Sequence, residues 1–355
     1  MPLKLSYTKQ DFHFAFEART SRGDMHQKTS WFISVSDTEQ PGHIGIGECG
    51  PLPGLSIDDR PDFETQLHLC IESINKTGIS LDNLAAKIHV LVPPIFPAIR
   101  FGLETALMDF QHGGRRVIYH NDFTRGAPIP INGLIWMGDA ASMLQQVKEK
   151  LSQGFTCLKL KVGGLDFDTE LSLIADVRKL AGLGITIRLD ANGSFPTSEA
   201  MTRLEALKKF NIHSIEQPLA PSNEAMRRLC STSPIPIALD EELITHTTYE
   251  NKKQLLLRLK PQFIVLKPML LGGLQGCKEW IDIADKLEIG WWVTSALESN
   301  IGLNAICQFV ANYRLTMPQG LGTGAIYKDN FPSPLRVHDG AIFYDNDKTW
   351  SPVVL

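Results

Sequence analysis

The stretch Thr156-Cys-Leu-Lys-Leu-Lys-Val162 is a short apolar run that carries two lysines. Period-two alternation places Lys159 and Lys161 on one face of a strand, with Lys161 nearer its carboxyl end. Helical spacing follows, and a second apolar run, residues 185–190, ends at Asp190. A strand, a helix and another strand within one short stretch indicate a βα repeat.

Similar apolar runs recur after a linker near residue 125. They span residues 129–135, 156–162, 185–190, 213–216, 236–240, 263–267, 290–295 and 317–322. Six of them carry a charged or hydroxyl side chain at or near their carboxyl end: Lys161, Asp190, Glu216, Asp240, Lys267 and Ser295. The intervals between these six are 29, 26, 24, 27 and 28 residues, about one βα unit each. Eight runs predict a closed parallel barrel over residues 126–324, with functional residues at the strand ends.

The first 125 residues follow another pattern. Extended runs at 3–17, 31–35 and 44–48 precede helical spacing at 62–75 and 98–112, which predicts an α+β domain over residues 1–125. Residues 47–56, rich in glycine and proline, are expected to form an exposed loop that covers a site. Residues 325–355 contain no clear βα unit and are expected to complete this α+β domain.

Composition excludes several classes of protein. The 355 residues include 39 acidic and 35 basic side chains, a net charge of −4, with 43% hydrophobic and 21% charged content. A disordered chain, a coiled coil, a nucleic-acid binder and a membrane protein are therefore disfavoured. Six isolated cysteines indicate buried apolar residues rather than a zinc site or a disulfide framework. We expect a cytoplasmic protein that binds a small molecule, and a homo-oligomer is compatible with the sequence.

Three of the strand-end residues are carboxylates: Asp190, Glu216 and Asp240. Carboxylates brought together in a barrel mouth repel one another unless a cation lies among them. Hard oxygen ligands without cysteine or paired histidine favour Mg²⁺ or Mn²⁺ over zinc. Any one of the three alone could instead cap a helix or form a turn. Their shared register with the βα period favours a metal site.

Two lysines flank these carboxylates. Lys161 on the second run and Lys267 on the sixth would face each other across the mouth. A divalent cation and a second lysine nearby disfavour the ammonium form, which would make one lysine a usable base. The alternative, that both are surface lysines, is disfavoured by the apolar runs that hold them. A Schiff-base lyase with Lys267 as nucleophile leaves the carboxylates unexplained, and a non-catalytic binding barrel leaves the whole set unexplained.

Several motifs together resemble the enolase superfamily, in the muconate-lactonizing subgroup. They are Lys159-Leu-Lys161, Asp190-Ala-Asn192, Glu216-Gln-Pro218, Asp240-Glu241, Lys267-Pro268 and residues 295–302. The resemblance implies an α/β fold, a modified TIM barrel of the (β/α)₇β type with an α+β capping domain, and an essential Mg²⁺. In this superfamily a lysine or histidine base works beside the metal.

Within the superfamily, residues 47–56, 131–138, 320–324 and 333–335 are similar to the o-succinylbenzoate synthase family. That resemblance implies the syn dehydration of 2-succinyl-6-hydroxy-2,4-cyclohexadiene-1-carboxylate in menaquinone biosynthesis, with Lys161 as acid and base and Lys267 as a stabilising cation. Dipeptide epimerases typically carry Asp-x-Asp at the eighth strand, where this chain has Gly322-Thr-Gly324. N-succinylamino acid racemases keep the same lysines and ligands, so that activity stays open.

The resemblance also implies roles for residues around the centre. Asn192 and Glu241 are expected to orient the metal ligands. Ser295, Glu298 and Ser299 are expected to position substrate, although Ser295 could instead cap a helix, because Ser-x-x-Glu is also a capping box. Gly322, Thr323 and Gly324 either offer backbone amides to the succinyl carboxylate or form a tight turn.

Overall fold

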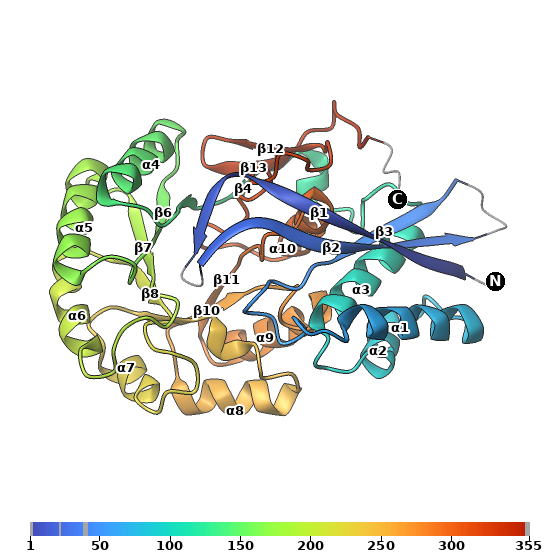
Figure 1. Ribbon diagram of the computed structural model, residues 1–355, viewed down its shortest axis with the longest axis horizontal. Coiled ribbons are helices and arrows are strands. Elements are labelled where there is room, and N and C mark those ends of the chain that lie inside the picture. The colour runs from blue at the N-terminus through green and yellow to red at the C-terminus, as the bar shows by residue number, and fades with distance from the viewer. Residues whose placement is uncertain (1–2, 21–22, 38–41, 352–355) are drawn as a thin grey trace.

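The computed structural model describes residues 3–20, 23–37 and 42–351, and its sheets comprise one seven-stranded parallel sheet and two three-stranded antiparallel sheets (Figure 1). The strands are β1 Leu3–Thr20, β2 Gly23–Asp37, β3 Ile44–Cys49, β4 Ile129–Pro130, β5 Gly133–Ile135, β6 Cys157–Lys161, β7 Thr186–Asp190, β8 Ser214–Glu216, β9 Ile237–Leu239, β10 Phe263–Leu266, β11 Gly290–Val293, β12 Leu335–His338 and β13 Ala341–Tyr344. The helices are α1 Phe63–Thr77, α2 Leu84–Leu91, α3 Pro97–Gln111, α4 Ala140–Ser152, α5 Phe167–Ala181, α6 Ala200–Leu207, α7 Met226–Thr232, α8 Tyr249–Leu259, α9 Gly273–Lys286 and α10 Asn300–Val310. Short 3-10 turns are η1 Phe123–Arg125, η2 Lys208–Phe210 and η3 Glu241–Leu243.

Strands β5 to β11 form the wall of a barrel, in the order of the chain. Residues 317–322 close it through single parallel bridges, Gln319 to Ile131 on one side and Gly320 to Thr294 on the other. One helix lies between each strand and the next, and none of the described helices follows the eighth run before β12. The predicted (β/α)₇β barrel is therefore confirmed.

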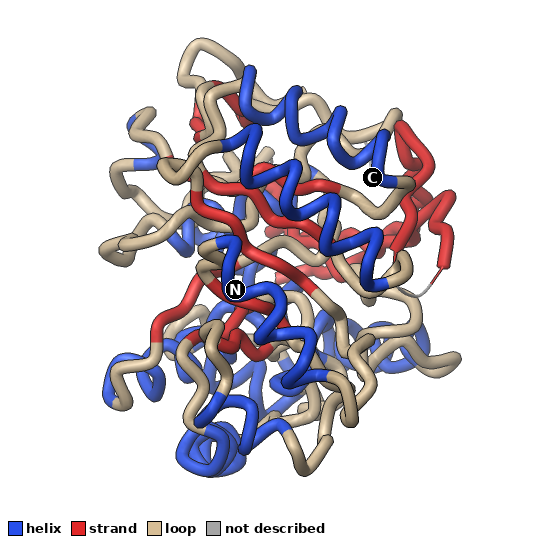
Figure 2. Tube along the Cα trace, turned by 90° about the vertical axis from the view of Figure 1, so that its left-hand side faces the viewer, coloured by secondary structure: helices blue, strands red, loops and turns tan. Residues whose placement is uncertain are grey.

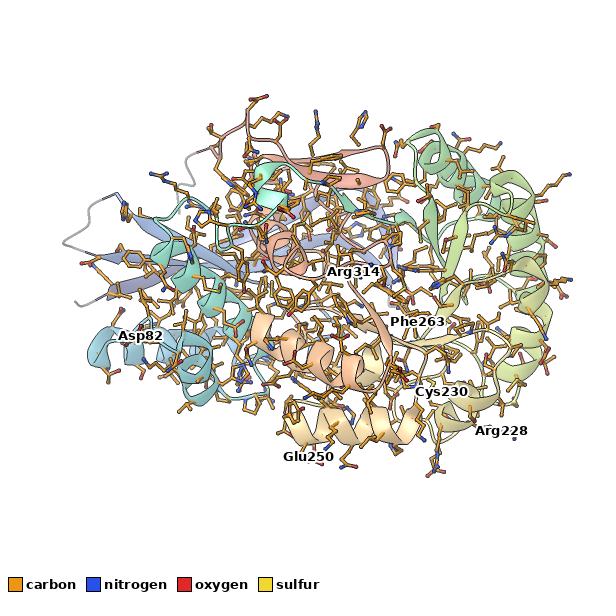
Figure 3. The ribbon with its side chains drawn as sticks, turned by 180° about the vertical axis from the view of Figure 1, so that it is seen from behind. Asp82, Arg228, Cys230, Glu250, Phe263 and Arg314 are labelled. Atoms are coloured by element: carbon orange, nitrogen blue, oxygen red, sulfur yellow. The ribbon has the colours of Figure 1, made fainter. Side chains whose placement is uncertain are left out.

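The barrel helices lie outside the strands, as the views along two further directions show (Figures 2 and 3). Their apolar stripes face the sheet while their polar sides face solvent, which is why the sequence alternates short apolar runs with amphipathic segments. Glu250, on α8, is exposed, whereas Phe263, at the start of β10, packs against Trp292 with ring centroids 5.6 Å apart.

The sheet β1-β2-β3 belongs to the α+β part of the chain and packs on α3. Nearly all of α3 is buried, because β3 lies against one side and α9 of the barrel against another. Glycine at position 47 permits this approach, since a Cβ there would overlap the backbone of Gly102. The predicted strands and the two predicted helices are present, and α2 was not predicted.

The C-terminal segment divides its contacts. Tyr327 and Phe331 pack on Phe12 of β1, with ring centroids 5.2 and 5.7 Å apart. The hairpin β12–β13 instead pairs with β4, just before the barrel begins. The assignment of residues 325–355 to the capping domain, and the boundaries at 125 and 324, stay proposals; residues 1–2, 21–22, 38–41 and 352–355 of the proposed ranges lie outside the described residues.

All six cysteines are buried and none forms a disulfide, as the sequence predicts. Among the described residues, we find no helix with both the length and the apolar character needed to cross a membrane.

Candidate active site

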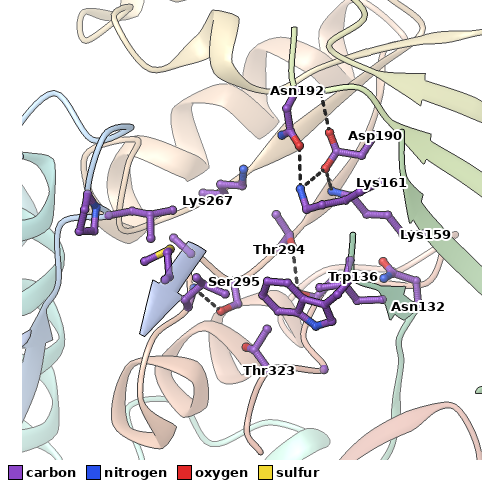
Figure 4. Close-up of a pocket in the computed structure, with 18 of the residues that line it drawn as sticks. Asn132, Trp136, Lys159, Lys161, Asp190, Asn192, Lys267, Thr294, Ser295 and Thr323 are labelled. Carbon is purple, nitrogen blue, oxygen red and sulfur yellow. Dashed lines mark hydrogen bonds and ion pairs between the residues drawn. The ribbon is translucent and has the colours of Figure 1, made fainter. Parts of the chain in front are cut away.

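A cavity of about 350 Å³ opens at the carboxyl ends of the barrel strands (Figure 4). This volume lies in the range of small-molecule sites, roughly 300–1,000 Å³. The strand ends contribute Asn132, Leu134, Trp136, Lys159, Lys161, Asp190, Asn192, Lys267, Thr294, Ser295, Ala296, Leu297, Gly320, Gly322 and Thr323. The capping part contributes Gly23, Asp24 and Met25 from the start of β2, and Leu52, Pro53 and Gly54 from the loop after β3. The loop predicted to cover a site therefore lines one. The expectation that residues 47–56 are exposed is wrong, because residues 47–49 end β3 and residues 47–52 are buried.

The strand register brings the predicted centre together. Lys161 lies opposite Asp190 on β6 and β7, and Asp190 lies opposite Glu216 on β8. Asp190, Glu216 and Asp240 are each at most 2% exposed. The Nζ of Lys159 lies 2.9 Å from Asp190 Oδ2 and 2.7 Å from Glu216 Oε2. The three predicted ligands thus end three successive strands and are buried beside a lysine.

Charge and burial oppose each other in this cluster. Burial, followed by the Asp190 carboxylate, raises the pKa of Glu216 well above its usual range, although Lys159 lowers it. For Asp190, burial also favours the neutral form, but Lys159 and Lys161 outweigh it and hold the pKa below its ordinary value. Burial would lower the pKa of Lys159, yet the surrounding carboxylates raise it. The carboxylates therefore need nearby positive charge to stay ionised.

The donor set fits a hard divalent cation. It consists of three buried carboxylates without cysteine or histidine, the ligand chemistry that Mg²⁺ and Mn²⁺ prefer. Glu216 Oε2 is buried and accepts no well-directed hydrogen bond, although the Lys159 ammonium is close. In the described ranges, however, no three His, Cys, Asp or Glu side chains converge as a metal site would require. The ammonium of Lys159 lies between Asp190 and Glu216 instead.

Lys161 reaches the cavity on a polar support. Its side chain is 15% exposed, and its Nζ lies 3.1 Å from Asp190 Oδ2 and 2.7 Å from Asn192 Oδ1. The Asn192 amide donates from Nδ2 to Glu241 Oε1 at 2.9 Å, and its backbone N–H donates to Asp190 Oδ1 at 3.1 Å. The predicted pair Asn192 and Glu241 therefore adjoins both the lysine and a predicted ligand.

Lys267 comes from the other side of the cavity (Figure 4). Its ammonium is paired with Asp240. Burial would lower the pKa of Lys267, but Asp240, Glu241 and Glu216 raise it above its usual value. The structure thus places Lys161 and Lys267 in one cavity, each paired with a different carboxylate.

The three residues after β11 separate in the structure. Ser295 lines the cavity, whereas Glu298 and Ser299 are fully buried behind it. Ser295 Oγ donates to Glu298 Oε2 at 2.5 Å. The helix cap is Ser299, whose side chain accepts from the Ile301 N–H, because α10 begins at Asn300. The alternative that Ser295 is the cap is therefore wrong.

The eighth run places Gly322 and Thr323 in the cavity wall, together with residues that sequence reasoning did not single out. Asn132 Oδ1 and Thr323 Oγ1 are buried and have no hydrogen-bond partner among the described residues. Asn132 could have been noticed in the sequence, because it is a polar residue inside the first apolar run. The start of β2 gave no comparable signal, because its position over the barrel depends on how the sheet packs.

The family described as "Enolase C-terminal domain-like" matches residues 142–347, more than half of the chain. The chain belongs to this family. The o-succinylbenzoate synthase of Desulfotalea psychrophila is 42% identical to this chain over 96% of this chain and 98% of the relative. An L-Ala-D/L-Glu epimerase of Bacillus subtilis is 26% identical over 81% of this chain and 79% of the relative.

Solved structures confirm the enolase-like fold. The crystal structure of MenC from Desulfotalea psychrophila has a TM-score of 0.83 at 40% identity and covers 97% of this chain and 100% of its own. The Bacillus subtilis L-Ala-D/L-Glu epimerase has a TM-score of 0.84 at 21% identity, over 97% and 96% of the two chains. The backbone therefore does not separate the two activities, whereas sequence identity does.

Proposed function

We propose that this enolase-family protein is an o-succinylbenzoate synthase, a carbon–oxygen lyase of menaquinone biosynthesis. It removes water from 2-succinyl-6-hydroxy-2,4-cyclohexadiene-1-carboxylate and releases 2-succinylbenzoate. The observation that carries the proposal is 42% identity to the Desulfotalea psychrophila o-succinylbenzoate synthase over nearly the full length of both chains. Lys161 and Lys267 in the cavity, with the three buried carboxylates, supply the chemistry that this reaction needs.

Lys161 is the proposed acid and base. As a free amine it takes the proton from the ring carbon beside the carboxylate, and the C–H electrons form the new double bond. The hydroxyl leaves from the neighbouring position and receives that proton from the Lys161 ammonium, so that one water departs and the ring becomes aromatic. Asn192 and Asp190, which hold Lys161 Nζ at 2.7 and 3.1 Å, orient it for both transfers.

Lys267 is the proposed electrostatic partner. Its raised pKa keeps it an ammonium, and it lies across the cavity from Lys161. A fixed positive charge stabilises the negative charge that develops on the substrate when the proton is removed. The same ion pair with Asp240 argues against the Schiff-base alternative, because a nucleophilic lysine must be neutral.

Membership in this family implies a divalent metal ion, and we propose Mg²⁺, with Mn²⁺ as a substitute. Asp190, Glu216 and Asp240 would hold it. The ion would draw electron density from the substrate carboxylate and so acidify the adjacent C–H. Lys159, now between Asp190 and Glu216, would keep the remaining carboxylate charge balanced.

The substrate tail is the proposed partner of the wall formed by Asn132, Ser295, Gly322 and Thr323. The buried Thr323 hydroxyl has no hydrogen-bond partner within the described structure. A hydroxyl can donate to a carboxylate, as a succinyl tail requires. The cytoplasmic location and a homo-oligomeric state stay predictions.

Racemisation of N-succinylamino acids is the second candidate. Two lysines on opposite sides of one cavity suit proton removal on one face and return on the other, and they are the observation that favours it. A dipeptide is a poorer candidate, since residues 322–324 offer no carboxylate to its ammonium group.

The test is direct. Purified protein with Mg²⁺ is mixed with the cyclohexadiene carboxylate, and the appearance of the aromatic product is followed by absorbance and mass. We expect loss of one water per substrate. Unchanged substrate under conditions where an established o-succinylbenzoate synthase converts it would contradict the proposal.

A further inference from the structure

A buried carboxylate of the capping sheet, Glu48, contacts a helix of the barrel. Glu48, near the end of β3, is fully buried and accepts hydrogen bonds from the start of α10. The Ser299 N–H and Oγ–H donate to it at 3.0 and 2.6 Å, and the Gly302 N–H donates at 3.1 Å. The two backbone donors are free N–H groups of a helix N-terminus, which favour a negative charge.

The capping side supplies the rest of this environment. Ser30 Oγ donates to Glu48 Oε1 at 2.8 Å, and the buried Lys28 Nζ lies 4.0 Å away and 3.3 Å from Ser30 Oγ. Glycine at position 302 is required for the contact, because a Cβ there would lie 2.8 Å from Glu48 Oε2. The Glu48 carboxylate is therefore enclosed by donors from both parts of the chain.

This contact stands beside two walls of the cavity. Residues 52–54 line the cavity and begin four residues after Glu48. Between Glu48 and these residues, the Gly50 N–H donates to Met269 Sδ at 3.2 Å. Residues 295–297 also line the cavity, and Leu297 lies two residues before Ser299. One carboxylate thus joins the loop that covers the cavity to the strand end opposite.

We propose that Glu48 is a positioning residue of the active site. It fixes the loop at 52–54 against the strand end at 295–297 and so sets the width of the cavity where the substrate binds. This inference rests on the proposed dehydration, because its effect is measured on that substrate. Glu48 lines no part of the cavity and touches no reacting atom.

The chain offers a matched control at Glu104. This second buried carboxylate of the capping part accepts from the Leu274 N–H at 2.6 Å and the Gln275 N–H at 3.4 Å, at the start of α9. It therefore makes the same kind of contact with a barrel helix. None of residues 268–279 lines the cavity, so the two contacts differ in their distance from the substrate.

The experiment compares Glu48→Gln and Glu104→Gln with the unchanged protein, each loaded with Mg²⁺. Circular dichroism and Tm establish folding, and kcat and KM are measured with the cyclohexadiene carboxylate. We expect Glu48→Gln to raise KM roughly 10-fold or more, because a cavity wall that moves loses contacts with the substrate. Misplacement by about 1 Å can cost about 100-fold in catalysis. Glu104→Gln should leave KM within roughly 2-fold, which is about 0.4 kcal/mol where a tenfold change is about 1.4 kcal/mol.

A folded Glu48→Gln with unchanged KM would overturn the inference, and so would equal KM changes in the two variants. If Glu48→Gln does not fold, Ser30→Ala is tested instead, because it removes one side-chain donor to Glu48 and leaves the backbone contacts in place. A higher KM in Ser30→Ala would support the inference, and an unchanged KM would overturn it. If the unchanged protein itself fails to dehydrate the substrate, the proposed function is wrong and this inference fails with it.

Discussion

The Nζ of Lys161 lies 2.7 Å from Oδ1 of Asn192, a residue 31 positions later in the chain. The same amide donates to Glu241 Oε1 at 2.9 Å, so its orientation is fixed with the oxygen toward the lysine. A lysine held in this way points its amine in one direction. Proton transfer then depends on a side chain that contributes no proton itself.

We therefore expect Asn192→Ala to lower kcat more than it changes KM. Loss of such an orienting partner lowers activity by roughly 10- to 100-fold. Steady-state kinetics over a range of pH would show the lower kcat and a displaced pH profile. Asn223→Ala is the control, because its amide bonds Thr197 on the exposed surface. Equal kinetics for Asn192→Ala and the unchanged protein would contradict the orienting role.

The two lysines should respond differently to substitution. Lys161→Ala removes the acid and base and should lower kcat by at least roughly 100-fold, the usual lower contribution of such a group. Lys267→Arg keeps the positive charge with changed geometry, so some dehydration should survive while any two-base racemisation is lost. Single-turnover measurements would separate the effects. Lys278→Ala, an exposed lysine on α9, should behave like the unchanged protein.

Wild-type turnover by Lys161→Ala would show that another group removes the proton. Loss of all dehydration in Lys267→Arg, with dehydration retained in Lys161→Ala, would reverse the two roles.

Removal of metal should abolish activity. A chelator withdraws the divalent ion that balances Asp190, Glu216 and Asp240, and added Mg²⁺ or Mn²⁺ should restore turnover. The variants Asp190→Asn, Glu216→Gln and Asp240→Asn should each raise the Kd for Mg²⁺ in calorimetry while circular dichroism stays unchanged. Full turnover by protein shown to be metal-free would be incompatible with the metal site.

Stability should depend on pH through Glu104. Burial raises the pKa of this carboxyl to about 8, above an unfolded value near 4.5, although the backbone N–H groups of Leu274 and Gln275 and the Arg100 guanidinium lower it. A raised folded-state pKa means that its contribution to stability is complete below about pH 4.5 and is lost as the pH rises through about 8. His89 Nε2, 4.0 Å away, has a pKa lowered by burial, and Glu279 also acts on the carboxyl.

The unfolding free energy from urea titration should therefore fall between pH 5 and 8 by an amount on the order of a few kcal/mol from this group. Glu104→Gln should flatten that part of the curve. An unchanged slope in the variant would show that folding does not raise the pKa of Glu104.

The barrel was predictable because its strands are buried on both faces, so each appears as a short apolar run interrupted only where a residue faces the mouth, as at Asp190. The position of Lys159 between Asp190 and Glu216 was less predictable: alternation gives its face but not which carboxylates it reaches. The contact of Glu48 with Ser299 joins residues 251 positions apart and depends on how the capping sheet docks. Helix α2 is short, and the side chain of Asn83 at its start makes no capping hydrogen bond.

The central claim, dehydration of the cyclohexadiene carboxylate, is tested most directly by ranking kcat/KM for three substrates. Purified Mg²⁺-loaded protein is assayed with that compound, with an N-succinylamino acid and with an L-Ala-L-Glu dipeptide, under one set of conditions. We predict that the cyclohexadiene carboxylate ranks first and loses water. An N-succinylamino acid ranking first would replace elimination by return of the proton from Lys267, and a dipeptide ranking first would contradict the account of the substrate altogether.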